Sequence, residues 1–237
     1  MLFEWLATSI DPARAHMITA EISWHARLMI AAWSFCIPLG IISARFFKIM
    51  PRQDWPNELD NRTWWLSHLI LQYLGGAFTL VALWIIWDFA KISEASSWHT
   101  WLGWIVVILC LAQFLAGWFR GTKGGPSEVS RTGTIRGDHY DMTPRRNLFE
   151  YFHKSAGYIC LLTSLITTAI GLWSVNAPRW MWIALAIWWL FIIVIFVVLQ
   201  RAGKTYDTYQ ALWGDDPELP GNRKKPIGIG VSRVNKE

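Results

Sequence analysis

Four of the six histidines in this chain lie close to the start of a long stretch without charged side chains. The six are His16, His25, His68, His99, His139 and His153. His25, His68, His99 and His153 are the four that lie beside such stretches. A neutral imidazole binds metal ions through one ring nitrogen, and it exchanges protons near neutral pH. These four side chains are therefore the first candidates for chemistry.

The stretches themselves predict membrane-spanning helices. No Asp, Glu, Lys or Arg occurs in residues 28–44, 63–87, 95–119, 155–178 and 180–200. A helix needs about 20 mostly apolar residues to cross the roughly 30 Å hydrocarbon core of a membrane. The chain is 53% hydrophobic and only 16% charged, which excludes an ordinary soluble domain. We predict an all-α integral membrane protein with five transmembrane helices, over about residues 24–46, 63–88, 97–119, 150–174 and 179–200.

The segments outside these helices are assigned from their composition. Residues 1–22 are expected to form an interfacial segment before the five-helix membrane domain, which covers residues 23–200. Residues 120–149 form a loop, and the Thr143-Pro144 pair within it predicts the start of the fourth helix. The tail, residues 201–237, alternates Gly, Pro and charge and is expected to be extended.

The basic residues predict the orientation in the membrane. With the N-terminus outside, 18 of the 22 Lys and Arg lie in the first loop, the third loop and the tail. Cytoplasmic loops accumulate Lys and Arg, so we expect the N-terminus outside and the loop 120–149 and the tail in the cytoplasm. The net charge of +5 is then explained by contact with anionic membrane lipid. Nucleic acid is not an expected partner.

Antiparallel neighbouring helices sort the four histidines into two pairs. His25 and His99 fall at the outer ends of the first and third helices, and His68 and His153 at the inner ends of the second and fourth. A haem iron has two axial positions, and helical bundles supply such ligands from facing helices. A structural zinc site needs three or four ligands close together, whereas each face offers only two histidines with no carboxylate partner. The pattern therefore predicts a four-helix bundle with two bis-histidine haems and a peripheral fifth helix. With both axial positions filled, the expected task is electron transfer.

Small residues near the histidines favour the same interpretation. Gly103 follows His99 by four residues and Gly157 follows His153 by four, so each glycine lies on the face of its histidine. A missing side chain there leaves room for a porphyrin ring. Gly75 and Gly76 lie two turns after His68 and are expected to serve the same purpose.

Basic residues at the inner side could neutralise the haem propionates. Arg45 and Lys48, just after the first helix, are placed for the inner haem. In the third loop the candidates for propionates or an anionic donor are Arg120, Lys123 and Arg136. His139, Tyr140 and Asp141 in the same loop could assist proton transfer. A solvated basic loop in contact with lipid or a partner subunit is the alternative for this segment.

The chain resembles the cytochrome b561 family, in particular its bacterial and DOMON-associated branch, from about His25 to Trp173. The resemblance rests on LMIAAWSFCIPLGIISARFFK after His25, WWLSHLILQYLGG around His68, WHTWLGW around His99 and FEYFHKSAGY around His153. It implies two haems b, paired first helix with third and second with fourth, and transmembrane electron transfer. Family members usually carry a sixth helix, whereas this chain has room for five, and no DOMON-like β-domain precedes its core.

From these features we expect a dihaem b-type cytochrome of the bacterial inner membrane that passes electrons between a donor and an acceptor on opposite faces. A quinone, an ascorbate-like reductant and a redox protein are the candidate partners. Two alternatives stay open. One is a membrane anchor that takes electrons from a periplasmic dehydrogenase and delivers them to quinone. The other is a structural accessory subunit of a larger complex. A homodimer also fits the sequence.

Overall fold

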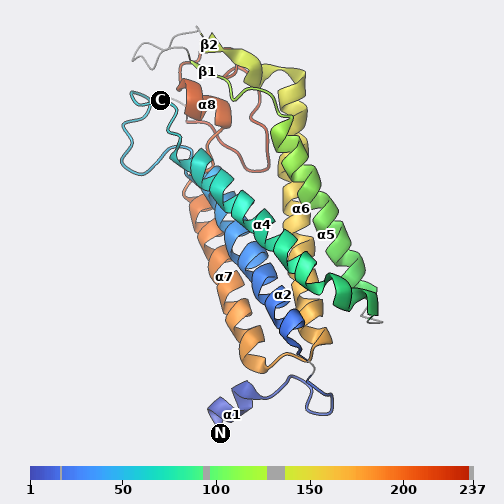
Figure 1. Ribbon diagram of the computed structural model, residues 1–237. Coiled ribbons are helices and arrows are strands. Elements are labelled where there is room, and N and C mark those ends of the chain that lie inside the picture. The colour runs from blue at the N-terminus through green and yellow to red at the C-terminus, as the bar shows by residue number, and fades with distance from the viewer. Residues whose placement is uncertain (17, 93–96, 127–136, 235–237) are drawn as a thin grey trace. The chain divides into compact units, whose positions relative to one another are not determined.

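The computed structural model describes residues 1–16, 18–92, 97–126 and 137–234, and within them the chain is mostly helical (Figure 1). The helices are α1 Leu2–Ala7, α2 Ala20–Ile30, η1 Ala31–Cys36, α3 Ile37–Phe46, α4 Thr63–Ile92, α5 Ser97–Trp118, η2 His139–Met142, α6 Pro144–Ser174, α7 Arg179–Arg201 and α8 Thr208–Trp213. Two short antiparallel strands, β1 Gly125–Pro126 and β2 Gly137–Asp138, pair with each other.

Five helical segments of the described residues are long and apolar enough to cross a membrane. They are Ala20–Phe46, Thr63–Asp88, Trp98–Trp118, Pro144–Ser174 and Arg179–Arg201, which confirms the predicted fold class. Helix α6 begins at Pro144, as the Thr143-Pro144 pair predicted, and the Thr143 Oγ1 atom accepts a hydrogen bond from the Arg146 amide at 3.3 Å. This helix therefore starts six residues before the predicted span at residue 150.

The chain divides into two compact units, and α4, α5, α6 and α7 each contribute residues to both. Unit 1 consists of Met1–Leu39, Leu71–Cys110 and Tyr158–Ile195. Unit 2 consists of Gly40–Ile70, Leu111–Gly157 and Phe196–Glu237.

In unit 1 the first span is interrupted by the π-helical turn η1, which the sequence did not predict. Ser34 in this turn is buried, and its carbonyl oxygen accepts a hydrogen bond from the Trp188 indole at 2.6 Å. The Ser34 hydroxyl accepts a second bond from the Trp189 indole at 3.1 Å. The Trp188 ring also stacks on Phe35 with centroids 4.4 Å apart. These contacts attach α7, the least buried of the five spans, to the first span, as expected for a peripheral helix.

In unit 2 the tail is folded, so the predicted extended tail is wrong. Helix α8 buries Tyr209, Leu212 and Trp213 together with Leu219, and Met142 packs against this cluster. Gly214 and Pro217, two of the residues that suggested an extended chain, lie in the bend between Trp213 and Leu219. Burial of the apolar side chains removes apolar surface from water, which stabilises the compact form.

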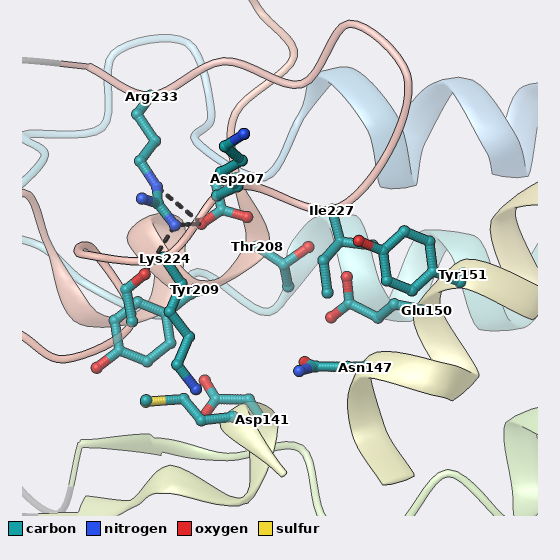
Figure 2. Close-up of a pocket in the computed structure, with 13 residues that line it drawn as sticks. Asp141, Asn147, Glu150, Tyr151, Asp207, Thr208, Tyr209, Lys224, Ile227 and Arg233 are labelled. Carbon is teal, nitrogen blue, oxygen red and sulfur yellow. Dashed lines mark hydrogen bonds and ion pairs between the residues drawn. The ribbon is translucent and has the colours of Figure 1, made fainter. Parts of the chain in front are cut away.

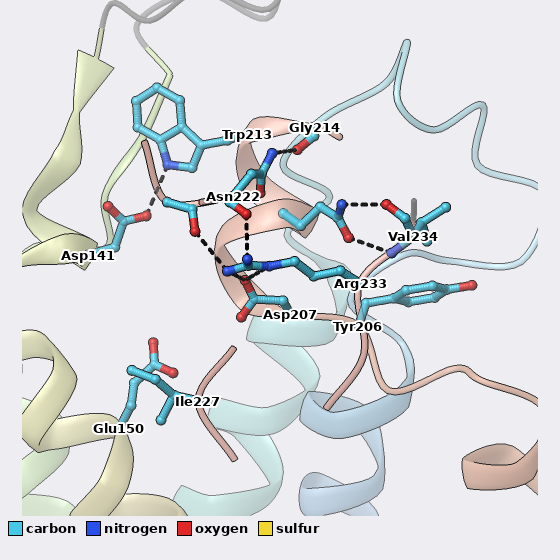
Figure 3. A network of polar contacts seen from close by, with 12 residues as sticks. Asp141, Glu150, Tyr206, Asp207, Trp213, Gly214, Asn222, Ile227, Arg233 and Val234 are labelled. Atoms are coloured by element: carbon cyan, nitrogen blue, oxygen red, sulfur yellow. Dashed lines mark hydrogen bonds and ion pairs between the residues drawn. The ribbon is translucent and has the colours of Figure 1, made fainter. Parts of the chain in front are cut away.

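Arg233 holds the end of the tail onto α8 (Figure 3). Its guanidinium donates to Asp207 Oδ2 at 3.2 and 3.3 Å and to the carbonyl oxygens of Gly221 and Asn222 at 2.7 and 2.5 Å. Gln210 exchanges two further hydrogen bonds with the Val234 backbone, at 2.7 and 2.8 Å. The donors of one arginine thus satisfy the Asp207 carboxylate and the two adjacent carbonyl oxygens of Gly221 and Asn222.

Candidate functional site

Unit 1 brings together His25 from α2 and His99 from α5. Their ring centroids are 6.2 Å apart and the ring planes are inclined by 79°. Unit 2 brings together His68 from α4 and His153 from α6 with the same centroid distance of 6.2 Å and the same angle of 79°. These are the two pairs that the alternating helix directions predicted. Two sites on different helices thus share one geometry.

The spacing of each pair fits a shared metal ion. An imidazole nitrogen binds a metal at about 2.0–2.1 Å, and this nitrogen lies about 1.1 Å from the ring centre. Two imidazoles on opposite sides of one ion therefore have ring centres about 6.3 Å apart. No group of three or more His, Cys, Asp and Glu side chains converges among the described residues. Each pair can thus supply the two axial ligands of a haem, but not the ligand set of a structural zinc site.

Backbone carbonyl groups fix the tautomer of three of the four rings. The Nδ1 atom of His25 is 3.1 Å from the Ala82 oxygen, and that of His99 is 3.0 Å from the Thr167 oxygen. His68 Nδ1 is 3.0 Å from the Gly40 oxygen. Because a carbonyl oxygen only accepts, Nδ1 carries the proton in each case, and the lone pair of Nε2 is left for a metal.

His153 is held differently. Its Nδ1 atom is buried and has no hydrogen-bond partner among the described residues. The ring stacks instead on Phe149, one turn earlier in α6, with centroids 5.0 Å apart and planes inclined by 24°. Aromatic stacking thus sets the orientation that a hydrogen bond sets for the other three.

Glycines leave room around the histidine rings, although not all of them do so as expected. A Cβ atom at Gly103 would meet nothing within 4 Å, and one at Gly157 would meet only the Gln113 side chain, at 3.6 Å. Both positions are therefore open, as a porphyrin requires. A Cβ atom at Gly171 would lie 2.9 Å from Cε1 of His99. Sequence reasoning missed Gly171, because a glycine in an apolar helix does not show which neighbour it faces.

Gly75 lies in a close helix contact. Its added Cβ atom would lie 2.8 Å from Cδ1 of Ile37, so the glycine allows α4 to approach the first span closely. Gly76 is also buried. That Gly75 and Gly76 make room for a porphyrin stays a prediction, and the contact with Ile37 gives Gly75 a packing role as well.

Arg45 and Lys48, which were expected near the inner propionates, contact the folded tail in unit 2. The guanidinium of Arg45 donates to the carbonyl oxygen of Ile229 at 2.6 Å and to Gln200 Oε1 at 2.8 Å. The Lys48 ammonium is buried and donates to the carbonyl oxygen of Tyr206 at 2.8 Å. Both cations therefore bind the folded tail, which the sequence did not predict.

The buried position of Lys48 predicts a pH-dependent attachment of the tail. Burial, and then the charge of Lys154, lowers the pKa of Lys48 to about 7 from an ordinary value of 10.5. Between these values the unfolded chain binds the extra proton, so the free energy of unfolding rises with pH across this window. We expect Lys48→Met to abolish this rise, as measured by tryptophan fluorescence during thermal unfolding in detergent. The exposed Lys204 is the control: Lys204→Met keeps the rise. A wild-type slope in Lys48→Met would contradict the prediction.

The third loop packs against the tail in unit 2. His139 stacks on Trp213 with centroids 4.1 Å apart, and Asp141 Oδ2 accepts a hydrogen bond from the Trp213 indole at 3.0 Å. Burial raises the pKa of Asp141 to about 6. Lys123 forms an ion pair with Asp60, and Arg136 lies outside the described residues. His139 and Asp141 thus join the third loop to the tail, and Lys123 joins it to the first loop.

A cavity of about 200 Å³ lies beside this packing (Figure 2). Asp141, Glu150, Asp207 and Arg233 are among the residues that line it. Two of these carboxylates already face cations: Asp207 binds Arg233, and Glu150 binds Arg146 and Lys154. Neither histidine pair lines the cavity, so it is separate from the candidate metal sites.

Known proteins resemble this chain over its helical part. Residues 24–132 match the family model described as eukaryotic cytochrome b561. The chain is 29% identical over 167 residues to a putative ferric-chelate reductase 1 homolog of Drosophila melanogaster, covering 68% of this chain and 22% of that protein. It is 25% identical over 150 residues to a cytochrome b561, DM13 and DOMON domain-containing protein of Arabidopsis thaliana, covering 62% and 14%. No solved structure matches it.

The match extends to part of the site only. The alignments span 22% and 14% of the lengths of these two relatives, so this chain corresponds to a small part of each. The family model includes His25, His68 and His99 and ends before His153. Residues 24–132 of this chain are thus similar to the cytochrome b561 family.

Proposed function

We propose that this protein is a dihaem b-type cytochrome that transfers electrons across a membrane. His25 and His99 hold one haem b, and His68 and His153 hold the other. When bound, haem b supplies a one-electron couple between ferric and ferrous iron. The observation that carries the proposal is the equal geometry of the two pairs, with centroids 6.2 Å apart in each.

The residues around the rings support a role in electron transfer. Hydrogen bonds from Nδ1 to the Ala82, Thr167 and Gly40 carbonyl oxygens hold three imidazoles in place. Rings that are already oriented need little movement when the charge of the bound iron changes. With both axial positions taken by histidine, neither oxygen nor a substrate has access to the iron.

The orientation of the chain is part of the proposal. The excess of Lys and Arg in the first loop, the third loop and the tail supports an N-terminus outside and a C-terminus in the cytoplasm of a bacterial inner membrane. The His25–His99 pair then serves the outer face, and the His68–His153 pair serves the inner face. A quinone, an ascorbate-like reductant and a redox protein are possible partners. Because the Drosophila melanogaster relative is named for ferric-chelate reduction, ferric chelates are the first acceptors to test.

Optical and magnetic spectra of the purified protein test this function. We expect a b-type α-band in the reduced-minus-oxidised spectrum and two haems per chain in a haem extraction assay. Imidazole planes inclined by 79° leave two iron d orbitals nearly equal in energy. The ferric protein should therefore show strongly anisotropic low-spin electron paramagnetic resonance signals. Protein that is folded but holds no haem would leave only the structural-subunit alternative.

A further inference from the structure

An aromatic ring lies next to each histidine of the His68–His153 pair, and an arginine guanidinium group lies over each of these rings. The Arg120 guanidinium lies 3.9 Å from the centroid of Trp65, and the Trp65 ring lies 6.3 Å from His68. The Arg146 guanidinium lies 5.0 Å from the centroid of Phe149, which stacks on His153. Two arginines from separate segments of unit 2 thus each contact an aromatic neighbour of one histidine of this pair.

These two cations lie close to each other and away from water. Arg146 is only 5% exposed. Burial, and then the charge of Arg146, lowers the pKa of Arg120 to about 10. Like charges held together in a poorly solvated place repel each other. An arrangement of this kind is stable when an anion lies between or beside the two groups.

The described residues neutralise the charge of these two arginines only in part. Arg146 Nε is 3.4 Å from Glu150 Oε1, but Glu150 also binds Lys154 at 2.7 Å. One carboxylate therefore faces two cations. Arg146 Nη1 is buried and has no hydrogen-bond partner among the described residues. Buried polar hydrogens are normally paired, so this donor is available to an acceptor outside the described residues.

We propose that Arg146 and Arg120 bind the propionate carboxylates of the haem held by His68 and His153. The inference rests on the proposed function, because it requires a haem at this pair. A guanidinium group binds carboxylates through two parallel donors, and its charge favours the reduced iron, which carries one positive charge fewer. Arg146 and Arg120 are therefore positioning residues that also raise the reduction potential of this haem. The sequence had already suggested Arg120 for the propionates, together with Arg45 and Lys48, whereas Arg146 is assigned from the structure.

The test uses full-length protein carrying His99→Ala, in which a single haem remains at the His68–His153 pair. In this background we expect Arg146→Gln to lower the ratio of ferrous to ferric haem at a fixed ambient potential at least tenfold, which is about 59 mV for a one-electron couple. Arg146→Lys should retain part of the effect because the charge remains. Arg145→Gln is the matched control, since Arg145 is the neighbouring arginine and donates to the Phe119 carbonyl oxygen at 2.6 Å.

A second measurement separates carboxylate binding from a general effect of charge. Haem labelled with ¹³C at its carboxylates gives identifiable bands in the redox-induced infrared difference spectrum. We expect these bands to shift in Arg146→Gln and in Arg120→Gln, but not in Arg145→Gln. Unchanged bands would assign the two guanidinium groups to another anion, such as a lipid phosphate, and would overturn the inference even if the potential moved.

The two proposals fail in different ways. A His99→Ala protein that is folded but holds no haem would overturn the proposed function, and the carboxylate site with it. If the His99→Ala protein holds one haem and its labelled carboxylate bands shift in neither Arg146→Gln nor Arg120→Gln, only the proposed carboxylate site is refuted. If Arg146→Gln does not accumulate because Glu150 loses a partner, Arg120→Gln decides the outcome, since Arg120 is more exposed.

Discussion

His99→Ala and His68→Ala should each reduce the haem content from two to one per chain. The two residues belong to different pairs, and each pair lies within a separate unit of the structure. Removing one imidazole leaves a single axial ligand at that site, while the other site keeps both. The measurement is the ratio of extracted haem to protein, together with the absorbance spectrum of the haem that remains.

Double variants test the pairing itself. In the proposed arrangement His25 and His99 share one site, so His25→Ala combined with His99→Ala should lose no more haem than either single change. The combination of His68→Ala with His99→Ala should lose both haems. Effects at one site are expected to be non-additive, and effects at separate sites additive. His16→Ala is the control, since His16 Nδ1 contacts the Asn176 carbonyl oxygen and belongs to neither pair. Loss of both haems from a single histidine change would refute the assignment.

Gly171→Val is expected to remove the haem of the His25–His99 pair and to spare the other haem. A Cβ atom at Gly171 would lie 2.9 Å from Cε1 and 3.2 Å from Nδ1 of His99. The His99 ring is held by its bond to the Thr167 carbonyl oxygen, one turn earlier on the same face of α6. The added side chain therefore has to push the ring out of its position and break that bond. The remaining haem should then resemble the one retained in His99→Ala, by absorbance spectrum and midpoint potential.

The matched control for this prediction is Gly117→Val in α5. A Cβ atom at Gly117 meets nothing within 4 Å, while the intrinsic cost of valine in a helix is the same at both positions. Gly117→Val should therefore keep two haems. If Gly171→Val also kept both haems with unchanged spectra, the ring of His99 would not need the space that Gly171 leaves.

The five spans and the two histidine pairs were predictable because both depend on local patterns. Missing charges mark a membrane helix without any knowledge of its neighbours. A histidine near the start of each of four such helices is sorted to one face or the other by helix direction alone. The start of α6 at Pro144 was equally readable from Thr143-Pro144, since a cap and a first-turn proline act within one turn of helix.

Features that depend on contacts between distant segments were not predictable. The bond from His25 to the Ala82 carbonyl oxygen joins residues 57 positions apart, and backbone acceptors leave no trace in the sequence. The role of Gly171 depends on which helix faces α6. The tail was misjudged because its Gly and Pro residues are equally typical of an extended chain and of turns around Leu212 and Trp213. Arg45 and Lys48 were assigned to propionates because the sequence gave no hint of the tail carbonyl groups that they bind.

The hydrogen bonds between Nδ1 atoms and backbone oxygens have a consequence for metal substitution. They attach each of three rings to a helix other than the one that carries it: His25 to α4, His99 to α6 and His68 to α3. The polypeptide itself, and not the iron, thus dictates how these rings are turned. A cobalt or manganese porphyrin inserted in place of haem would meet the same crossed imidazoles and inherit the same ligand-field symmetry.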